Sequence, residues 1–265
     1  MAPQYVKPYV KTNKHDAADA EACCEAVQRP GMRFVAAQGE HQQALVMLHR
    51  IRDRLIAERT GSINAIRGHM AEFGIVAAQG AAGMKEILAI ISDLDDKRLS
   101  PLARDLLALE VAHLRDLEAK IGELDARVRR LAREDATCRR LSEVPGVGPI
   151  VATGVVAMVG DARSFDSGRS FAAWLGLTPR QHSTGGKERL LGISKRGDGY
   201  LRRQLMHGAR SIVRLAAGRE GQLWGWINGL LARRPFNTVV AAVANKLARI
   251  IWAVLARGET YRAAA

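Results

Sequence analysis

Apolar residues recur along most of this chain at steps of three and four, the spacing of an amphipathic helix. The most regular pattern follows Ser100-Pro101 and predicts a long helix with a heptad seam at Leu107, Val111, Leu114, Leu117, Ile121, Leu124, Val128 and Leu131. A second long helix is predicted over residues 41–73. The seam could pair with that helix in the same chain or with a second chain, and the pattern alone allows both.

Shorter helices are predicted around these two, at residues 16–30, 84–94, 168–174, 199–217, 221–231 and 238–256. Residues 1–15 are expected to be extended because Pro3 and Pro8 oppose helix, and residues 177–194 form a loop or hairpin. The predicted fold class is therefore mainly α. Three parts are expected: residues 1–38, a helical coiled-coil linker at 39–140, and a helical C-terminal domain at 141–265.

A Pro-Gly-Val-Gly turn separates two apolar helical segments near residue 146. Pro145 ends the first segment, Gly146 and Gly148 permit left-handed backbone angles, and Pro149 suits the first position of the next helix. Free N–H groups at that helix start can hold an anion. The pattern is typical of the helix-hairpin-helix of non-sequence-specific DNA binders, although a tight turn without a ligand would have the same residues.

A glycine-rich basic segment follows this turn and contains Ser183. Residues 161–265 hold 18 Lys and Arg against 6 Asp and Glu, whereas residues 1–160 hold 22 against 21. The net charge of +13 is thus concentrated in the C-terminal part, which favours a polyanionic partner. A hydroxyl within such a segment could attack a phosphodiester.

The remaining composition excludes several classes. No stretch reaches about 18 uninterrupted apolar residues, so no membrane partner is expected. Three cysteines, two of them adjacent at Cys23 and Cys24, give neither a disulfide framework nor metal spacing. A reducing, cytoplasmic setting is expected.

Asp16 and Asp19 lie three residues apart on a predicted helix, so their carboxylates share one face. Paired carboxylates can ligate Mg²⁺. Acidic residues are also favoured in a first helical turn by the helix dipole alone.

Three segments together resemble a known family: KPYVKTNKHDAADAEACCEAV, PGVGPIVA and WLGLTPRQHSTGGKERLLGISKRGDGYLRRQL. They are similar to insertion-sequence transposases of the class that combines a DEDD acid quartet with a serine, the one-ten and eleven-eleven groups, also described as bridge-RNA-guided recombinases. The resemblance covers essentially the whole chain. It implies an α/β RuvC-like domain that binds Mg²⁺, a helical linker and a C-terminal serine domain. It also implies dimers or tetramers on DNA with a structured guide RNA, in the bacterial cytoplasm at the nucleoid.

Residue by residue, the resemblance implies that Asp16 and Asp19 are the last two acids of the quartet and ligate the metal. Ser183 would form the covalent link to DNA, next to Lys187 and Arg189. The turn, the loop and the resemblance together give the expected DNA-binding residues: Gly146, Gly148, Thr184, Gly185, Gly186, Lys187, Arg189, Lys195, Arg196, Arg202 and Arg203.

The family's first two acids precede the segment that opens this chain. The chain is therefore expected to be an N-terminally truncated member, with residues 1–38 as the remnant of the RuvC-like domain and with no activity alone. Three functions remain open: a transposase completed by a full-length partner, a non-catalytic DNA- or RNA-binding remnant, and an unrelated helix-hairpin-helix nucleic-acid binder. Tyr200 is the alternative nucleophile to Ser183.

Overall fold

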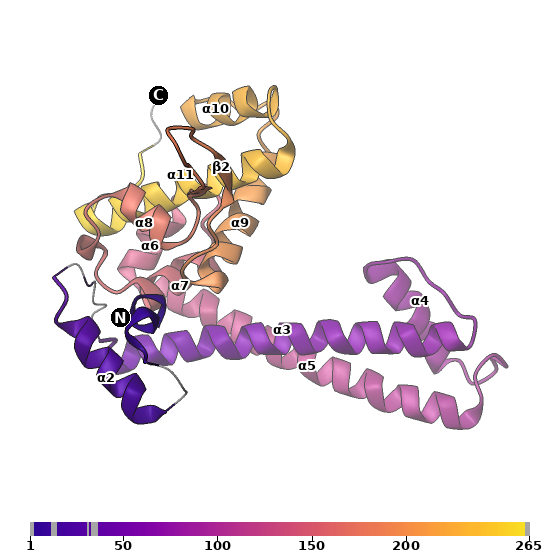
Figure 1. Ribbon diagram of the computed structural model, residues 1–265. Coiled ribbons are helices and arrows are strands. Elements are labelled where there is room, and N and C mark those ends of the chain that lie inside the picture. Colours follow the sequence, from indigo (N-terminus) through magenta and orange to yellow (C-terminus); the bar gives the residue numbers. More distant parts are fainter. Residues whose placement is uncertain (1–2, 12–14, 31, 33–36, 263–265) are drawn as a thin grey trace. The chain divides into compact units, whose positions relative to one another are not determined.

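The computed structural model describes residues 3–11, 15–30, 32 and 37–262 (Figure 1). The chain divides into two compact units, Met1–Gly39 and Glu40–Ala265. The first unit contains α1 (Pro3–Val6), the 3-10 helix η1 (Lys7–Tyr9) and α2 (Asp16–Val27). The prediction of extended backbone is wrong for residues 3–9. Pro3 and Pro8 lie in the first turns of their helices, where a backbone N–H has no intrahelical partner and its absence in proline costs nothing. The described part of this unit contains no strand, so its RuvC-like origin stays a prediction.

The second unit begins with two long antiparallel helices, α3 (Glu40–Glu72) and α5 (Pro101–Glu134), which lie side by side in Figure 1. The start of the predicted seam on α5 packs against the end of α3, and its middle packs against Leu55 near the centre of α3. The seam is therefore buried by pairing within the chain. Of the two pairings that the pattern allowed, the structure shows the intramolecular one.

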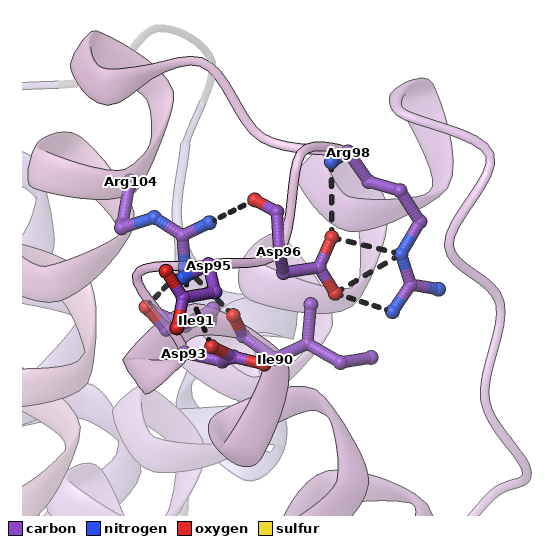
Figure 2. A network of polar contacts seen from close by, with 7 residues as sticks. All are labelled: Ile90, Ile91, Asp93, Asp95, Asp96, Arg98 and Arg104. Carbon is purple, nitrogen blue, oxygen red and sulfur yellow. Dashed lines mark hydrogen bonds and ion pairs between the residues drawn. The ribbon is translucent and has the colours of Figure 1, made fainter.

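The far end of this helical pair carries α4 (Ala81–Ser92), which the buried Arg104 holds in place. Arg104 is 8% exposed, and its Nη1 donates to the carbonyl oxygens of Ile90 and Ile91, both at 2.8 Å (Figure 2). Its Nη2 donates to the carbonyl of Asp96 at 2.7 Å. The Asp96 carboxylate in turn accepts from Arg98, which lowers the pKa of Asp96 to about 2. Arg104 thus satisfies the last carbonyls of α4, which a helix leaves unpaired.

The rest of the second unit is a helical domain around one core. Its helices are α6 (Ala136–Ser142), α7 (Pro149–Val159), η2 (Ala162–Ser164), α8 (Gly168–Trp174), α9 (Gly199–Arg214), α10 (Gln222–Leu231) and α11 (Phe236–Arg257). The strands β1 (Pro179–Gln181) and β2 (Leu190–Ile193) form an antiparallel hairpin between α8 and α9. The protein is therefore mainly α, as predicted.

Helix α11 is the central helix of this domain and packs against α8 and α9. Its inner face is fully buried at Val240, Val243, Leu247 and Ile251. By length and composition α11 is apolar enough to cross a membrane, but 44% of its most apolar window is buried inside this unit. A core helix has the same composition.

Candidate functional site

Ser183 lies near the tip of the β1–β2 hairpin, in a stretch exposed from residue 179 to 192. The tip is a two-residue turn in which the N–H of Lys187 donates to the carbonyl of Thr184 at 3.1 Å. Gly185 and Gly186 have φ angles of +56° and +75°. Positive φ at both central positions defines a type I′ turn, which glycines adopt without strain and which matches the twist of the strands. The Gly-Gly pair thus folds the hairpin back on itself immediately after Ser183 and Thr184.

Cross-strand contacts fix the orientation of Ser183. The N–H of His182 donates to the carbonyl of Arg189 at 2.9 Å, and the Ser183 Oγ accepts from the N–H of Arg189 at 3.3 Å. The serine hydroxyl therefore lies opposite the backbone of Arg189. The exposed Lys187 follows the turn and lies on the same arm of the hairpin as Arg189. This arrangement places an exposed serine in a hairpin tip that also carries the exposed Lys187 and Arg189.

The base of the hairpin is fixed by close approach of backbones. Gly176 and Gly197 have φ angles of +71° and +76°. A Cβ on Gly176 would lie 2.1 Å from the carbonyl oxygen of Arg196, and one on Gly197 would lie 1.8 Å from that of Trp174. Neither position can hold a larger residue without moving the backbone. Gly197 thus lets the end of the hairpin pack against the backbone of α8.

Two of the predicted DNA-binding arginines have partners within the chain. Arg202 Nη1 donates to the carbonyls of Leu175 at 3.2 Å and Arg196 at 2.9 Å. Arg203 pairs with Asp53 of α3 at 2.5 Å. Both arginines therefore hold the hairpin base and the long helices to α9, a role that the sequence did not reveal. Lys187, Arg189, Lys195 and Arg196 are exposed, and their assignment to DNA stays a prediction.

The turn between α6 and α7 has a buried side and an open side. Val144 and Val147 are buried, and Gly146, at φ +82°, packs directly on Gly208 of α9. A Cβ on Gly146 would lie 2.9 Å from the carbonyl oxygen of Gly208, and one on Gly208 would lie 2.1 Å from that of Gly146. Gly146 was expected to bind DNA. In the structure, the absence of a side chain at Gly146 is what allows α9 to pack against this turn. At Gly148, the exposed residue before α7, nothing lies within 4 Å of an added Cβ.

A buried polar chain, which sequence reasoning missed, connects α3, α7 and α9. His49 is fully buried; its Nδ1 lies 2.8 Å from the Tyr200 hydroxyl and its Nε2 lies 3.0 Å from Thr153 Oγ1. Thr153 donates its proton to the carbonyl of Pro149 at 2.7 Å. The Thr153 oxygen must then accept from Nε2–H, so Nδ1 accepts from Tyr200.

This chain decides the chemical state of Tyr200 and His49. Burial lowers the pKa of His49 to about 4, with a smaller contribution from Arg52, so the ring is neutral at pH 7. Burial raises the pKa of Tyr200 to about 12. A buried, protonated phenol that already donates to His49 is poorly suited to attack DNA. Of the two candidate nucleophiles, Ser183 is exposed and Tyr200 is half-buried.

Asp16 and Asp19 are exposed in the first turn of α2. His15 caps this helix, and its side chain accepts a hydrogen bond from the N–H of Ala17. In the described part of the chain, no three His, Cys, Asp or Glu residues gather into a group that could hold a metal ion. Two carboxylates on one helix do not surround a cation, because ligands must converge on it from several sides. These residues alone do not fit a complete Mg²⁺ site.

Comparison with known proteins identifies the family to which this chain belongs. Residues 138–222 match the profile described as "Transposase IS116/IS110/IS902 family", and residues 1–75 match a DEDD transposase profile of the IS110 type. The first match contains the α6–α7 turn, the hairpin and α9.

Full-length relatives agree with these matches. The chain is 49% identical over 263 residues to a "Probable family 20 transposase" of Pseudomonas aeruginosa, covering 99% of this chain and 78% of that protein. It is 43% identical over 265 residues to the transposase for insertion sequence element IS1111A of Coxiella burnetii, covering 100% and 73%. It is 41% identical over 261 residues to the transposase for IS1328 of Yersinia enterocolitica, covering 98% and 77%. The chain belongs to the IS110/IS116/IS902 family of insertion-sequence transposases.

Proposed function

We propose that this transposase cleaves and rejoins DNA through a covalent intermediate on Ser183. The observation that carries the proposal is the position of Ser183: an exposed hydroxyl held by Arg189 beside a type I′ turn, within the segment that matches the family. A nucleophile on a short, well-anchored hairpin can approach a phosphate that lies on the protein surface.

In the proposed reaction, Ser183 Oγ attacks the phosphorus atom of a DNA strand. The Oγ–P bond forms, the P–O bond to one sugar oxygen breaks, the serine proton passes to a base in solution and the leaving oxygen takes up a proton. A sugar hydroxyl of the joining strand then attacks the phosphoserine, which restores the strand and releases Ser183. Lys187 and Arg189 would stabilise the charge on the attacked phosphate.

The resemblance also implies Mg²⁺, and the family is typically metal-dependent. Asp16 and Asp19 would contribute two of the Mg²⁺ ligands. The described part of the chain places no third His, Cys, Asp or Glu beside them, so residues elsewhere would have to supply the other ligands. The steps above use only groups of the second unit.

The proposed binding of DNA and of a guide RNA is supported by the positive charge of the C-terminal part. Residues 161–265 carry a net charge of +12, which gives affinity for any phosphate backbone. The exposed Gly148 at the start of α7 offers N–H groups to a phosphate, in keeping with a helix-hairpin-helix role for this turn. A guide RNA would be held by the same charge.

The proposed oligomer would form through the outer face of α5. Its inner seam is buried on α3, but Leu102, Leu106 and Leu109 are 69%, 56% and 69% exposed and follow a helical spacing of four and three. These three leucines, which we call the outer stripe, form an apolar face that a second copy could cover.

Incubation of the protein with DNA of the element end, followed by denaturing electrophoresis, tests the proposed chemistry. With a family member that carries the whole acid quartet added, a Ser183-dependent adduct of this chain is expected, absent in Ser183→Ala and present in Ser211→Ala, which removes another exposed serine of the same unit; the chain alone should form little or none. Retained DNA binding in Ser183→Ala would show that the loss is chemical. Binding without an adduct in the unaltered protein, even with that family member added, would support the non-catalytic alternative instead.

A further inference from the structure

A basic hollow of about 350 Å³ lies between the base of the hairpin and α9. Ile193 and Lys195 line it from the hairpin side, and Met206, His207 and Arg210 line it from α9. The α9 residues share one face because they follow one another at helical spacing. The hollow does not include Ser183, so the proposed chemistry leaves it without a role.

The charge of the hollow favours an anionic ligand. Lys195, Arg202, Arg203 and Arg210 contribute four positive charges, and no Asp or Glu is among the described residues that line it. Arg202 and Arg203 have the intramolecular partners described above. The cations that remain for a ligand are Lys195 and Arg210.

Among the residues that line this hollow, Arg210 has a side-chain atom, its Nε, that is buried without a hydrogen-bond partner in the described structure. Lys195 is also the one non-glycine residue of the described chain with positive φ, at +57°. The backbone therefore places this lysine at the hollow at a conformational cost.

The remaining lining is suited to a base or a sugar. Ile193 and Met206 supply apolar contacts, and the exposed ring of His207 can stack on a base. Single-strand binding sites combine cations for the backbone with stacking surfaces of this kind. A volume of this size lies at the small end of ligand sites, about 300–1,000 Å³, so the hollow has room for one nucleotide.

We propose that this hollow binds one unpaired nucleotide of a nucleic-acid strand, with a phosphate at Arg210 and Lys195 and the base or sugar against Met206. The proposal rests on the proposed function in that it takes nucleic acid to be the substrate, but it does not depend on Ser183 chemistry. The site would hold a strand that has left its duplex, or an unpaired segment of RNA.

Fluorescence anisotropy of the full chain with labelled oligonucleotides tests this site. The probes are a short oligothymidylate, an oligouridylate of equal length, and a DNA hairpin duplex with the same number of phosphates. Arg210→Gln should weaken binding of a single strand about tenfold, since a charged hydrogen bond is lost. Its effect on the duplex should stay below about twofold. Arg214→Gln, which removes an exposed arginine one turn further along α9, should change each probe by less than about twofold.

Lys195→Asn provides a second variant that should fold normally, because asparagine tolerates the left-handed backbone at this position. It should show the same preferential loss on single strands. Stronger binding of oligouridylate would identify an RNA strand, recognised through its 2′-hydroxyl, and stronger binding of oligothymidylate would identify a DNA strand; either supports the site.

Equal losses on single strands and duplex in both variants would overturn the proposal, as would the absence of single-strand binding by the unaltered chain. Ser183→Ala should leave these affinities unchanged. A missing adduct together with intact, Arg210-dependent single-strand binding would therefore count against the proposed chemistry and not against the hollow.

Discussion

Acidification is expected to destabilise the second unit by charging His49. The ring is fully buried and accepts from Tyr200 through Nδ1. Protonation would add a charge that burial opposes and would turn this acceptor into a second donor facing the Tyr200 hydroxyl. The contact that links α3 to α9 would then be lost or rearranged.

The magnitude follows from the shift in pKa. His49 titrates at about 4 in the folded protein, against 6.5 for an unperturbed histidine. Between these values the unfolded chain binds the proton and the folded chain does not, so the free energy of unfolding falls as pH falls. At about 1.36 kcal/mol per pKa unit, the full loss approaches about 3 kcal/mol, and lowering the pH from about 7 to about 5 should cost about 2 kcal/mol.

Urea unfolding followed by tryptophan fluorescence measures this loss, because all four tryptophans lie between residues 174 and 252. The comparison uses His49→Gln, since glutamine does not titrate and can still accept from Tyr200 and donate to Thr153. His207→Gln removes an exposed histidine as the matched control.

The difference in unfolding free energy between the unaltered protein and His49→Gln should change by about 2 kcal/mol between pH 7 and pH 5. His207→Gln should follow the unaltered protein throughout. A constant difference between the His49 variant and the unaltered protein would show that His49 is not held neutral, and would refute the direction of the hydrogen-bonded chain.

Three further predictions follow from the turn, the charge and the outer stripe. Gly146→Ala should destabilise the second unit by about 2–4 kcal/mol in the same urea assay, from the left-handed backbone and the contact with α9, whereas Gly148→Ala should change stability by less than about 0.5 kcal/mol and weaken DNA binding; a reversed order would contradict the packing. The logarithm of the DNA association constant should fall with the logarithm of salt concentration at a slope of roughly −4 to −7, for about 5–8 phosphate contacts, and a flat response would exclude the charge argument. Leu106→Lys should shift the protein toward monomer in light scattering, while Leu215→Lys, at another exposed leucine, should not; unchanged assembly would remove the outer stripe as the interface.

Local patterns predicted most of the helices. The apolar spacing on α3 and α5, and the turn residues around α8, depend on neighbours close in sequence, which is why the bounds of these elements agree with the prediction to within a few residues. Residues 177–194 were expected to form a loop or hairpin, and the structure shows the hairpin. The extended backbone expected for residues 3–9 was wrong because a proline opposes the interior of a helix and not its first turn.

The contacts that sequence could not predict join residues far apart in the chain. Gly146 and Gly208 are 62 positions apart, and Arg203 and Asp53 are 150 apart. No spacing rule links such pairs, so an arginine that holds α3 looked in sequence like one that binds DNA. The family resemblance predicted Ser183 as the nucleophile, and the structure adds that Ser183 is exposed whereas Tyr200 is half-buried against His49.

Mass spectrometry of the trapped adduct tests the central claim most directly. Trypsin cleaves after Lys and Arg and gives a peptide of residues 181–187 that contains Ser183 and Thr184. Tyr200 falls in a separate tryptic peptide of residues 197–202. After nuclease digestion, a residual nucleotide should be found on the first peptide, and fragmentation should place it on Ser183. A nucleotide on Thr184 or Tyr200, or on neither peptide, would contradict the assignment of Ser183 as the nucleophile.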